Sequence, residues 1–72
     1  MKTSAIQQLR KQLAANQPTF GMWVTLEGAS ITEMAVALGL DWVVIDAEHG
    51  HLGWQEIVQH LRATVRSETV AL

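Results

Sequence analysis

A short apolar run in the middle of the chain constrains the fold more than any other feature. Four consecutive apolar residues, Trp42 to Ile45, stand between Asp41 and Asp46 without polar alternation. A strand with one face in water alternates apolar and polar residues, whereas a strand covered on both faces is apolar throughout. Such strands belong to parallel sheets covered by helices. The run therefore predicts an α/β fold.

The segment before this run predicts a helix and then a strand. Ser4 and Gln7 have the spacing of a capping box, which satisfies free amides at a helix start. One apolar stripe follows, made by Ile6, Leu9 and Leu13. Pro18 disfavours the helical conformation in the residue before it, so we expect the helix to end at residues 16–18. Residues 19–26 are rich in β-branched and aromatic side chains and predict a strand.

The segments on either side of the central run continue this order. Ser30 and Glu33 form a second capping-box pattern, and residues 31–38 predict a short helix that ends at Gly39. A longer helical stripe begins after the run and consists of Trp54, Ile57, Val58, Leu61 and Val65. Residues 68–72 predict the start of a third strand.

The resulting order is helix, strand, helix, strand, helix, strand, which is typical of successive right-handed βαβ units. We interpret residues 1–72 as one segment, with about two and a half βα units preceded by a helix. So few units cannot close a barrel, and they leave the edges of a parallel sheet open. The chain is therefore interpreted as part of a larger parallel-sheet protein.

The composition excludes several functional classes. Hydrophobic residues make up 49% and charged residues 17%, as in a globular domain. The net charge of −2 lacks the basic excess that drives binding to nucleic acid or anionic membranes, so neither partner is expected. The chain has no cysteine, which excludes disulfides and thiolate metal sites. Without a membrane-length apolar run or a secretory signal, a cytoplasmic location is expected.

Chemically capable side chains gather directly after the central run. Asp46, Glu48, His49 and His51 lie within six residues. Active sites of α/β proteins lie at the carboxyl ends of strands, and these groups can supply a general base with its orienting carboxylate, or metal ligands. The alternative is a solvated loop in which Asp46 and Glu48 cap the next helix. The position of the cluster favours a functional role.

Other residues carry weaker signals. Trp23 lies in a strand that ends at the same sheet edge as Asp46, so it can form the wall of a pocket. Otherwise, Trp23, Trp42 and Trp54 are typical core or interface residues. His60 follows Glu56 by four residues, which favours an exposed helical ion pair over a functional role. The chain contains no phosphate-binding glycine loop or dinucleotide fingerprint.

Several strings in fixed order resemble the start of the HpcH/HpaI aldolases. They are Phe-Gly-Met-Trp at 20–23, Thr-Glu at 32–33, Gly-Leu-Asp-Trp-Val-Val-Ile-Asp at 39–46 and Glu-His-Gly at 48–50. The resemblance extends from about Gln12 onward. Members of this family are class II, metal-dependent pyruvate aldolases. The resemblance implies the N-terminal part of a TIM (β/α)8 barrel, and reversible aldol cleavage of 4-hydroxy-2-oxo acids to pyruvate and an aldehyde.

The resemblance also implies roles for individual residues. His49 matches the catalytic histidine that accepts the proton of the substrate hydroxyl. Asp46 matches the carboxylate at the strand end, in the polar shell around metal-bound water or the catalytic histidine. Trp23 matches the tryptophan that packs near the pyruvate methyl group. Glu48 belongs to the motif without an implied chemical role, and His51 stands where many members have proline or another residue.

The complete enzyme is implied to be a homo-oligomer, a hexamer, that acts on small 2-oxo acids and aldehydes. It would use Mg²⁺, Mn²⁺ or Co²⁺ to hold the pyruvate enolate. The metal-binding Glu and Asp of the family and its transition-state arginine fall beyond Leu72. We therefore expect no tight metal site within residues 1–72 and no activity from this chain alone.

Two alternatives to this interpretation stay open. One is a related lyase that acts on acyl-CoA thioesters of the malyl or citramalyl type. The other is a non-catalytic truncated product that acts through its exposed sheet edges. The Asp-x-Glu-His string at residues 46–49 favours the aldolases over the related lyases.

Overall fold

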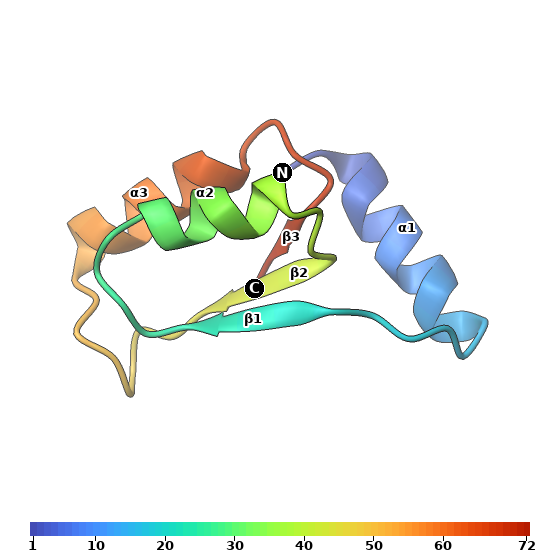
Figure 1. The fold of residues 1–72 in the computed structure, drawn as a ribbon, viewed down its shortest axis with the longest axis horizontal. Helices are drawn as coiled ribbons and strands as arrows, with labels where there is room; N and C mark the ends of the chain where they lie inside the picture. The colour runs from blue at the N-terminus through green and yellow to red at the C-terminus, as the bar shows by residue number, and fades with distance from the viewer.

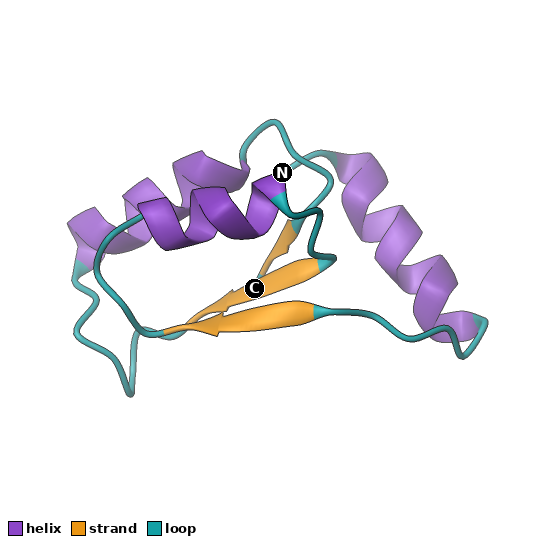
Figure 2. Ribbon diagram, in the orientation of Figure 1, coloured by secondary structure: helices purple, strands orange, loops and turns teal.

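Strands and helices alternate along the chain to form one parallel sheet with helices around it (Figure 1). The computed structural model describes all 72 residues. The elements are α1 (Thr3–Ala14), β1 (Gly21–Val24), α2 (Ser30–Ala37), β2 (Trp42–Ile45), α3 (Trp54–Thr64) and β3 (Val70–Ala71). The predicted order of elements and the α/β class are confirmed (Figure 2).

The sheet has the order β1-β2-β3, and both neighbouring pairs are parallel. In the register of β1 and β2, Gly21 pairs with Trp42 and Val24 pairs with Ile45. The ladder continues past β2, since the backbone N–H of Asp46 donates to the carbonyl of Val24 at 3.0 Å. Parallel strands end at the same edge, so the loops that follow β1 and β2 lie next to each other there.

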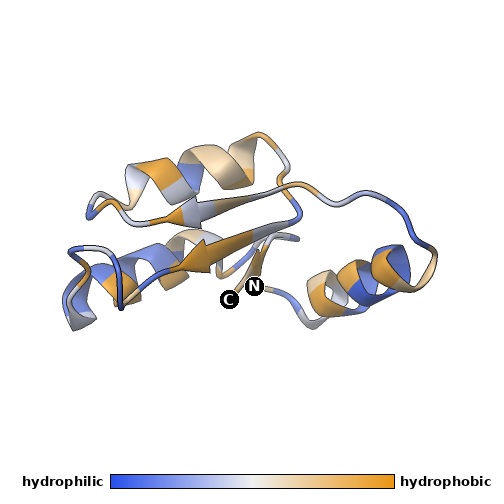
Figure 3. Ribbon diagram, turned by 90° about the horizontal axis from the view of Figure 1, so that it is seen from below, coloured by the Kyte–Doolittle hydropathy of each residue, from blue (hydrophilic) through white to orange (hydrophobic).

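The core lies between one face of the sheet and the helices α2 and α3 (Figure 1). It is built on Val24, Ala35 and Val43, and only 11 of the 72 residues are buried. The helix α1 stands beyond the amino ends of the strands (Figures 1 and 3). None of the helices combines the length and apolar character that crossing a bilayer requires.

The opposite face of the sheet is not covered in the way its sequence predicts. Of the apolar run in β2, only Val43 is buried, while Trp42, Val44 and Ile45 are half-buried. Successive side chains of a strand point to opposite faces, so Val43 enters the core. Trp42 and Val44 line an open apolar hollow with residues of α1. The prediction of burial on both faces is therefore wrong within this chain, because no helix lies flat over the second face.

The helix ends also differ from the predicted capping boxes. Ser4 does not cap α1, and its hydroxyl lies 3.0 and 3.1 Å from the carboxylate oxygens of Glu68. No side chain caps α2, in which Ser30 is already the first helical residue. The ending at Gly39 is confirmed by its φ of +75°, the left-handed conformation that glycine adopts without steric cost. Asn16 adopts a similar φ of +56° after α1.

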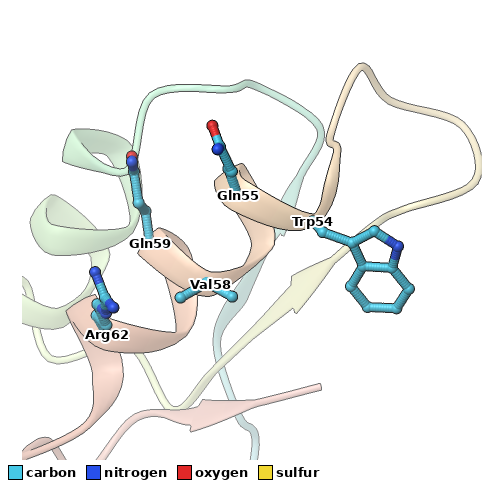
Figure 4. Close-up of a pocket in the computed structure, with 5 residues that line it drawn as sticks. All are labelled: Trp54, Gln55, Val58, Gln59 and Arg62. Carbon is cyan, nitrogen blue, oxygen red and sulfur yellow. The ribbon is translucent and has the colours of Figure 1, made fainter.

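The helix α3 turns a different face toward the core than its apolar stripe suggests. Its buried residues are His60 and Thr64. Trp54 is 83% exposed, and the stripe residues Val58, Leu61 and Val65 are exposed as well. The side chain of Trp54 extends away from the helix in Figure 4. The stripe correctly predicts a helix, but the packing of α2 against α3 places the polar side chains of Thr32 and His60 between the two helices.

The predicted exposed ion pair between Glu56 and His60 is wrong for the same reason. His60 has no exposed surface, because it lies on the inner face of α3. Glu56 instead accepts the backbone N–H of Gly53 at 3.0 Å and satisfies an unpaired amide at the start of α3.

Candidate active site

The carboxyl edge of the sheet brings together residues from two neighbouring strands. Asp46 follows the last residue of β2, and Trp23 lies in β1 opposite Val44. His49 lies in the turn that follows Asp46. The three predicted site residues are therefore placed at one edge by the parallel pairing of β1 and β2.

The carboxylate of Asp46 is the centre of this cluster. Its Oδ1 accepts the backbone N–H groups of Glu48 at 2.8 Å and of His49 at 2.9 Å. Its Oδ2 accepts the indole N–H of Trp23 at 2.9 Å and lies 3.2 Å from Nδ1 of His49. Asp46 is 8% exposed, whereas the side chain of His49 is 73% exposed. A fixed carboxylate thus holds an imidazole that faces solvent.

These donors also set the charge of Asp46. The backbone N–H of His49, the indole N–H of Trp23 and the backbone N–H of Glu48 hold the pKa of the Asp46 carboxyl well below its usual range. Hydrogen bonds to a carboxylate favour its ionised form, and here they outweigh the opposing effect of burial. Asp46 is consequently an anion at neutral pH.

The contact with Asp46 selects one tautomer of His49. An ionised carboxylate only accepts hydrogen bonds, so Nδ1 of His49 carries the proton in this contact. In the neutral ring, Nε2 then keeps a free lone pair. Its nearest acidic neighbour is Oε1 of Glu48 at 3.7 Å, between two exposed side chains, where a charge interaction is weak. The arrangement is that of a general base with an orienting carboxylate.

Neither Asp46 nor Glu48 caps the next helix, as the alternative interpretation expects, although the loop itself is exposed. Asp46 accepts amides of its own turn, and the start of α3 is capped by Glu56 rather than by Asp46 or Glu48. His51 is exposed and makes no hydrogen bond in the structure. The cluster therefore consists of Trp23, Asp46 and His49, with Glu48 at its rim.

The donor atoms of the cluster bear on whether it can hold a metal ion. No group of three His, Asp or Glu side chains is placed to hold an ion. Both oxygens of Asp46 are already engaged, one by two backbone amides and the other by Trp23 and His49. A hard divalent cation requires several oxygen ligands, which this cluster does not offer. The cluster is therefore suited to acid–base chemistry rather than to holding an ion by itself.

Sequence reasoning missed one residue near this edge. His60 is buried on α3 and forms hydrogen bonds to Thr32 and to the carbonyl of Leu26, in the loop after β1. The available signal is the pair His60 and Thr64, which repeats at helical spacing beside the apolar stripe. The shallow hollow on the outer side of α3 in Figure 4 shares no residue with the cluster.

Fold and cluster together define an α/β protein with an aspartate–histidine pair at the carboxyl edge of a parallel sheet. No model of a protein family matches the chain. Among curated proteins, the hydroxypyruvate/pyruvate aldolase of Agrobacterium fabrum is 35% identical over 60 residues, which are 83% of this chain and 23% of that protein. The hydroxypyruvate/pyruvate aldolase of Sagittula stellata is 34% identical over 56 residues, 78% of this chain and 22% of that protein.

A second kind of relative carries a different substrate in its name. The 4-hydroxy-2-oxo-heptane-1,7-dioate aldolase of Escherichia coli is 33% identical over 51 residues, 71% of this chain and 20% of that protein. The chain spans about a fifth of the length of the curated relatives it matches. The resemblance to these aldolases is thereby confirmed over 51 to 60 residues of the chain.

Proposed function

We propose that this chain is part of a metal-dependent pyruvate aldolase, a carbon–carbon lyase that cleaves 4-hydroxy-2-oxo acids reversibly to pyruvate and an aldehyde. The observation that carries the proposal is the contact of Asp46 with His49 at the carboxyl edge of the sheet. The names of the curated relatives support an aldol reaction. An aldol cleavage needs a base for the substrate hydroxyl, and the exposed Nε2 of His49 is suited to that task.

Each residue of the cluster has a distinct part in the proposed reaction. His49 accepts the proton of the 4-hydroxyl at Nε2 as the carbon–carbon bond breaks, and returns it in the reverse condensation. Asp46, ionised and held by three N–H donors, keeps His49 in the required tautomer and stabilises the imidazolium that forms. Trp23 orients Asp46 through its indole N–H, and its exposed ring forms a wall for the pyruvate methyl group.

The proposal extends to the complete enzyme. Its three strands would be part of a TIM (β/α)8 barrel, in which active sites lie at the carboxyl ends of the strands. The complete enzyme would be a homo-oligomer that uses Mg²⁺, Mn²⁺ or Co²⁺. When bound, such an ion stabilises the negative charge of the pyruvate enolate. In this proposal residues 1–72 supply the base and part of the pocket wall, and the metal ligands come from elsewhere.

The decisive experiment compares two histidines of one turn in the complete enzyme. His49→Ala is expected to lower kcat by about 10²- to 10⁴-fold, the usual contribution of a positioned acid–base group. His51→Ala is the matched control and is expected to leave kcat unchanged. The measurement is pyruvate release from a 4-hydroxy-2-oxo acid, coupled to lactate dehydrogenase, with each metal in turn. Equal losses in both variants would remove His49 from its proposed role.

Two further assays separate the alternatives. Cleavage of a malyl- or citramalyl-CoA thioester in place of the oxo acid would identify the related acyl-CoA lyase. The purified 72-residue chain is expected to release no pyruvate with any of the three metals. No three of its His, Asp or Glu side chains are grouped to hold the metal ion that would act as the Lewis acid. Metal-dependent turnover above that of its His49→Ala variant would contradict the proposal that the metal ligands come from outside residues 1–72.

A further inference from the structure

His60 is the largest fully buried side chain of the protein, and it lies outside the catalytic cluster. Both of its ring nitrogens have a partner. Nδ1 lies 2.6 Å from Oγ1 of Thr32 on α2, and Nε2 lies 2.9 Å from the backbone carbonyl of Leu26. His60 takes part in no ion pair. One imidazole therefore connects α3, α2 and the loop after β1.

The chemistry of the two partners defines the tautomer of this ring. A carbonyl oxygen can only accept, so the proton is on Nε2 of His60 and is donated to Leu26. The hydroxyl of Thr32 then donates to the lone pair of Nδ1. Every donor and acceptor of the buried ring is satisfied in this arrangement, which is what burial of a polar group requires.

Residues 25–27, in the loop after β1, form no hydrogen bond other than the one to His60. Thr25, Leu26 and Glu27 are exposed and make no backbone–backbone hydrogen bond. The bond from Nε2 of His60 to the Leu26 carbonyl is the one hydrogen bond that this segment forms. An exposed segment with so few bonds depends strongly on each of them for its position.

The turn that carries His49 packs against this loop. A Cβ atom on Gly50 would lie 2.8 Å from the carbonyl oxygen of Thr25 and 3.1 Å from its Cα. Gly50 follows His49 directly and Thr25 precedes Leu26 directly. A displacement of the Leu26 carbonyl would therefore be transmitted through Thr25 to the turn that carries His49.

We propose that His60 is a positioning residue of the active site, which holds the loop after β1 through the Leu26 carbonyl and thereby fixes the turn of His49. Its consequence for turnover rests on the proposed aldolase function. The mechanical link between His60 and the turn does not, because it is a property of the folded chain.

The link is tested by amide hydrogen exchange on the 72-residue chain. The reporters are the amides of Glu48 and His49, which donate to Asp46, and the reference is the amide of Ala15 at the end of α1. In His60→Leu, which has an apolar side chain without donors, exchange at the two reporters is expected to accelerate about three- to tenfold relative to Ala15. This is the effect of losing one hydrogen bond.

Two matched variants separate positioning from general stability. Thr32→Val removes the other hydrogen bond of the same ring and keeps the bond to Leu26, so the reporters are expected to follow the reference. His60→Gln keeps an N–H donor for Leu26 and is expected to restore slow exchange at the reporters. Acceleration in Thr32→Val as large as in His60→Leu, or no rescue by His60→Gln, would overturn the proposal.

The unsubstituted chain provides a test that does not depend on the folding of any variant. Nitrogen-15 NMR of the imidazole is expected to show His60 with its proton on Nε2. A proton on Nδ1, or unprotected reporter amides in this chain, would overturn the proposal.

Activity is the second readout. In the complete enzyme, His60→Leu is expected to lower kcat more than it changes KM, with recovery in His60→Gln. Unchanged kcat in His60→Leu would refute the catalytic consequence. If the unsubstituted enzyme releases no pyruvate, the aldolase function fails, while the exchange result still decides the link to His49.

Discussion

The indole N–H of Trp23 donates to Oδ2 of Asp46 at 2.9 Å, from one strand to the end of the next. Burial in the core does not explain the position of the Trp23 side chain, because 62% of the surface of this residue is exposed. Trp42, on the neighbouring strand, also donates through its indole, but to the hydroxyl of Thr19 at 3.2 Å. Two tryptophans on adjacent strands thus make comparable bonds, and only the bond of Trp23 reaches the carboxylate of Asp46.

This difference predicts distinct effects of two equivalent substitutions. Trp23→Phe removes the second strongest of the interactions that lower the pKa of Asp46, so that pKa is expected to rise toward the usual aspartate range. Trp42→Phe keeps the donors of Asp46 and is expected to leave its pKa in place. Carbon-13 NMR titration of the Asp46 carboxyl measures both. A rise of equal size in the two variants would show that the indole bond is not the cause.

The lowered pKa of Asp46 also predicts how stability depends on pH. The unfolded chain protonates this carboxyl near its ordinary pKa of about 4, whereas the folded chain keeps it ionised to lower pH. The stabilisation is therefore complete above about pH 4 and is lost progressively as the pH falls toward the folded pKa. Asp46→Asn removes the titrating group and is expected to flatten this acid dependence.

Urea unfolding followed by circular dichroism between pH 5 and pH 2 measures the dependence. Glu33→Gln on α2 is the control, since Glu33 forms no ion pair or side-chain hydrogen bond. The control is expected to retain the acid slope of the unsubstituted chain. If the free energy of unfolding of Asp46→Asn falls with pH as steeply as that of the unsubstituted chain, other carboxylates cause the loss of stability in acid.

The pairing of β1 with β2 depends on a glycine under an aromatic ring. Gly21 lies opposite Trp42, and a Cβ on Gly21 would overlap the indole at 1.9 to 2.2 Å. Gly21→Ala is therefore expected to destabilise the fold by about 1–3 kcal/mol, as overpacking usually does. Gly28→Ala is the matched control, since its Cβ would have nothing within 4 Å.

The control substitution is expected to be neutral or stabilising by up to about 1 kcal/mol, because alanine restricts the unfolded chain. The free energy of unfolding in urea measures both variants. A loss of stability that is the same for Gly21→Ala and Gly28→Ala would mean that the stacked indole moves aside without cost.

The outer side of α3 predicts self-association of the 72-residue chain. Its exposed apolar residues include Trp54, Val58 and Leu61, and contiguous exposed apolar surface favours association. The double variant Val58→Glu with Leu61→Glu is expected to lower the association seen by sedimentation velocity. Adding the same charge at Gln55 and Gln59 controls for repulsion and is expected to have a smaller effect. Equal effects of the two double variants would exclude the apolar stripe as the contact.

The type and order of the elements and the position of the cluster follow from the sequence alone. The central apolar run predicts a strand, the stripe from Trp54 predicts a helix, and Gly39 marks a helix end, because each signal depends on neighbours along the chain. Asp46 and His49 are also found from the sequence, since their chemistry stands directly after a strand. Trp23 is predicted at the same edge because parallel strands end together.

Which face of each element is covered is decided only by the tertiary structure. The helical spacing predicts His60 as an exposed partner of Glu56, and it is instead a buried bridge between Thr32 and the Leu26 carbonyl. Helical periodicity identifies the apolar face of a helix, but it does not show which other element packs against that helix or on which face. The partners of His60 are 28 and 34 residues away along the chain, so its hydrogen bonds form only when α2, α3 and the loop after β1 come together.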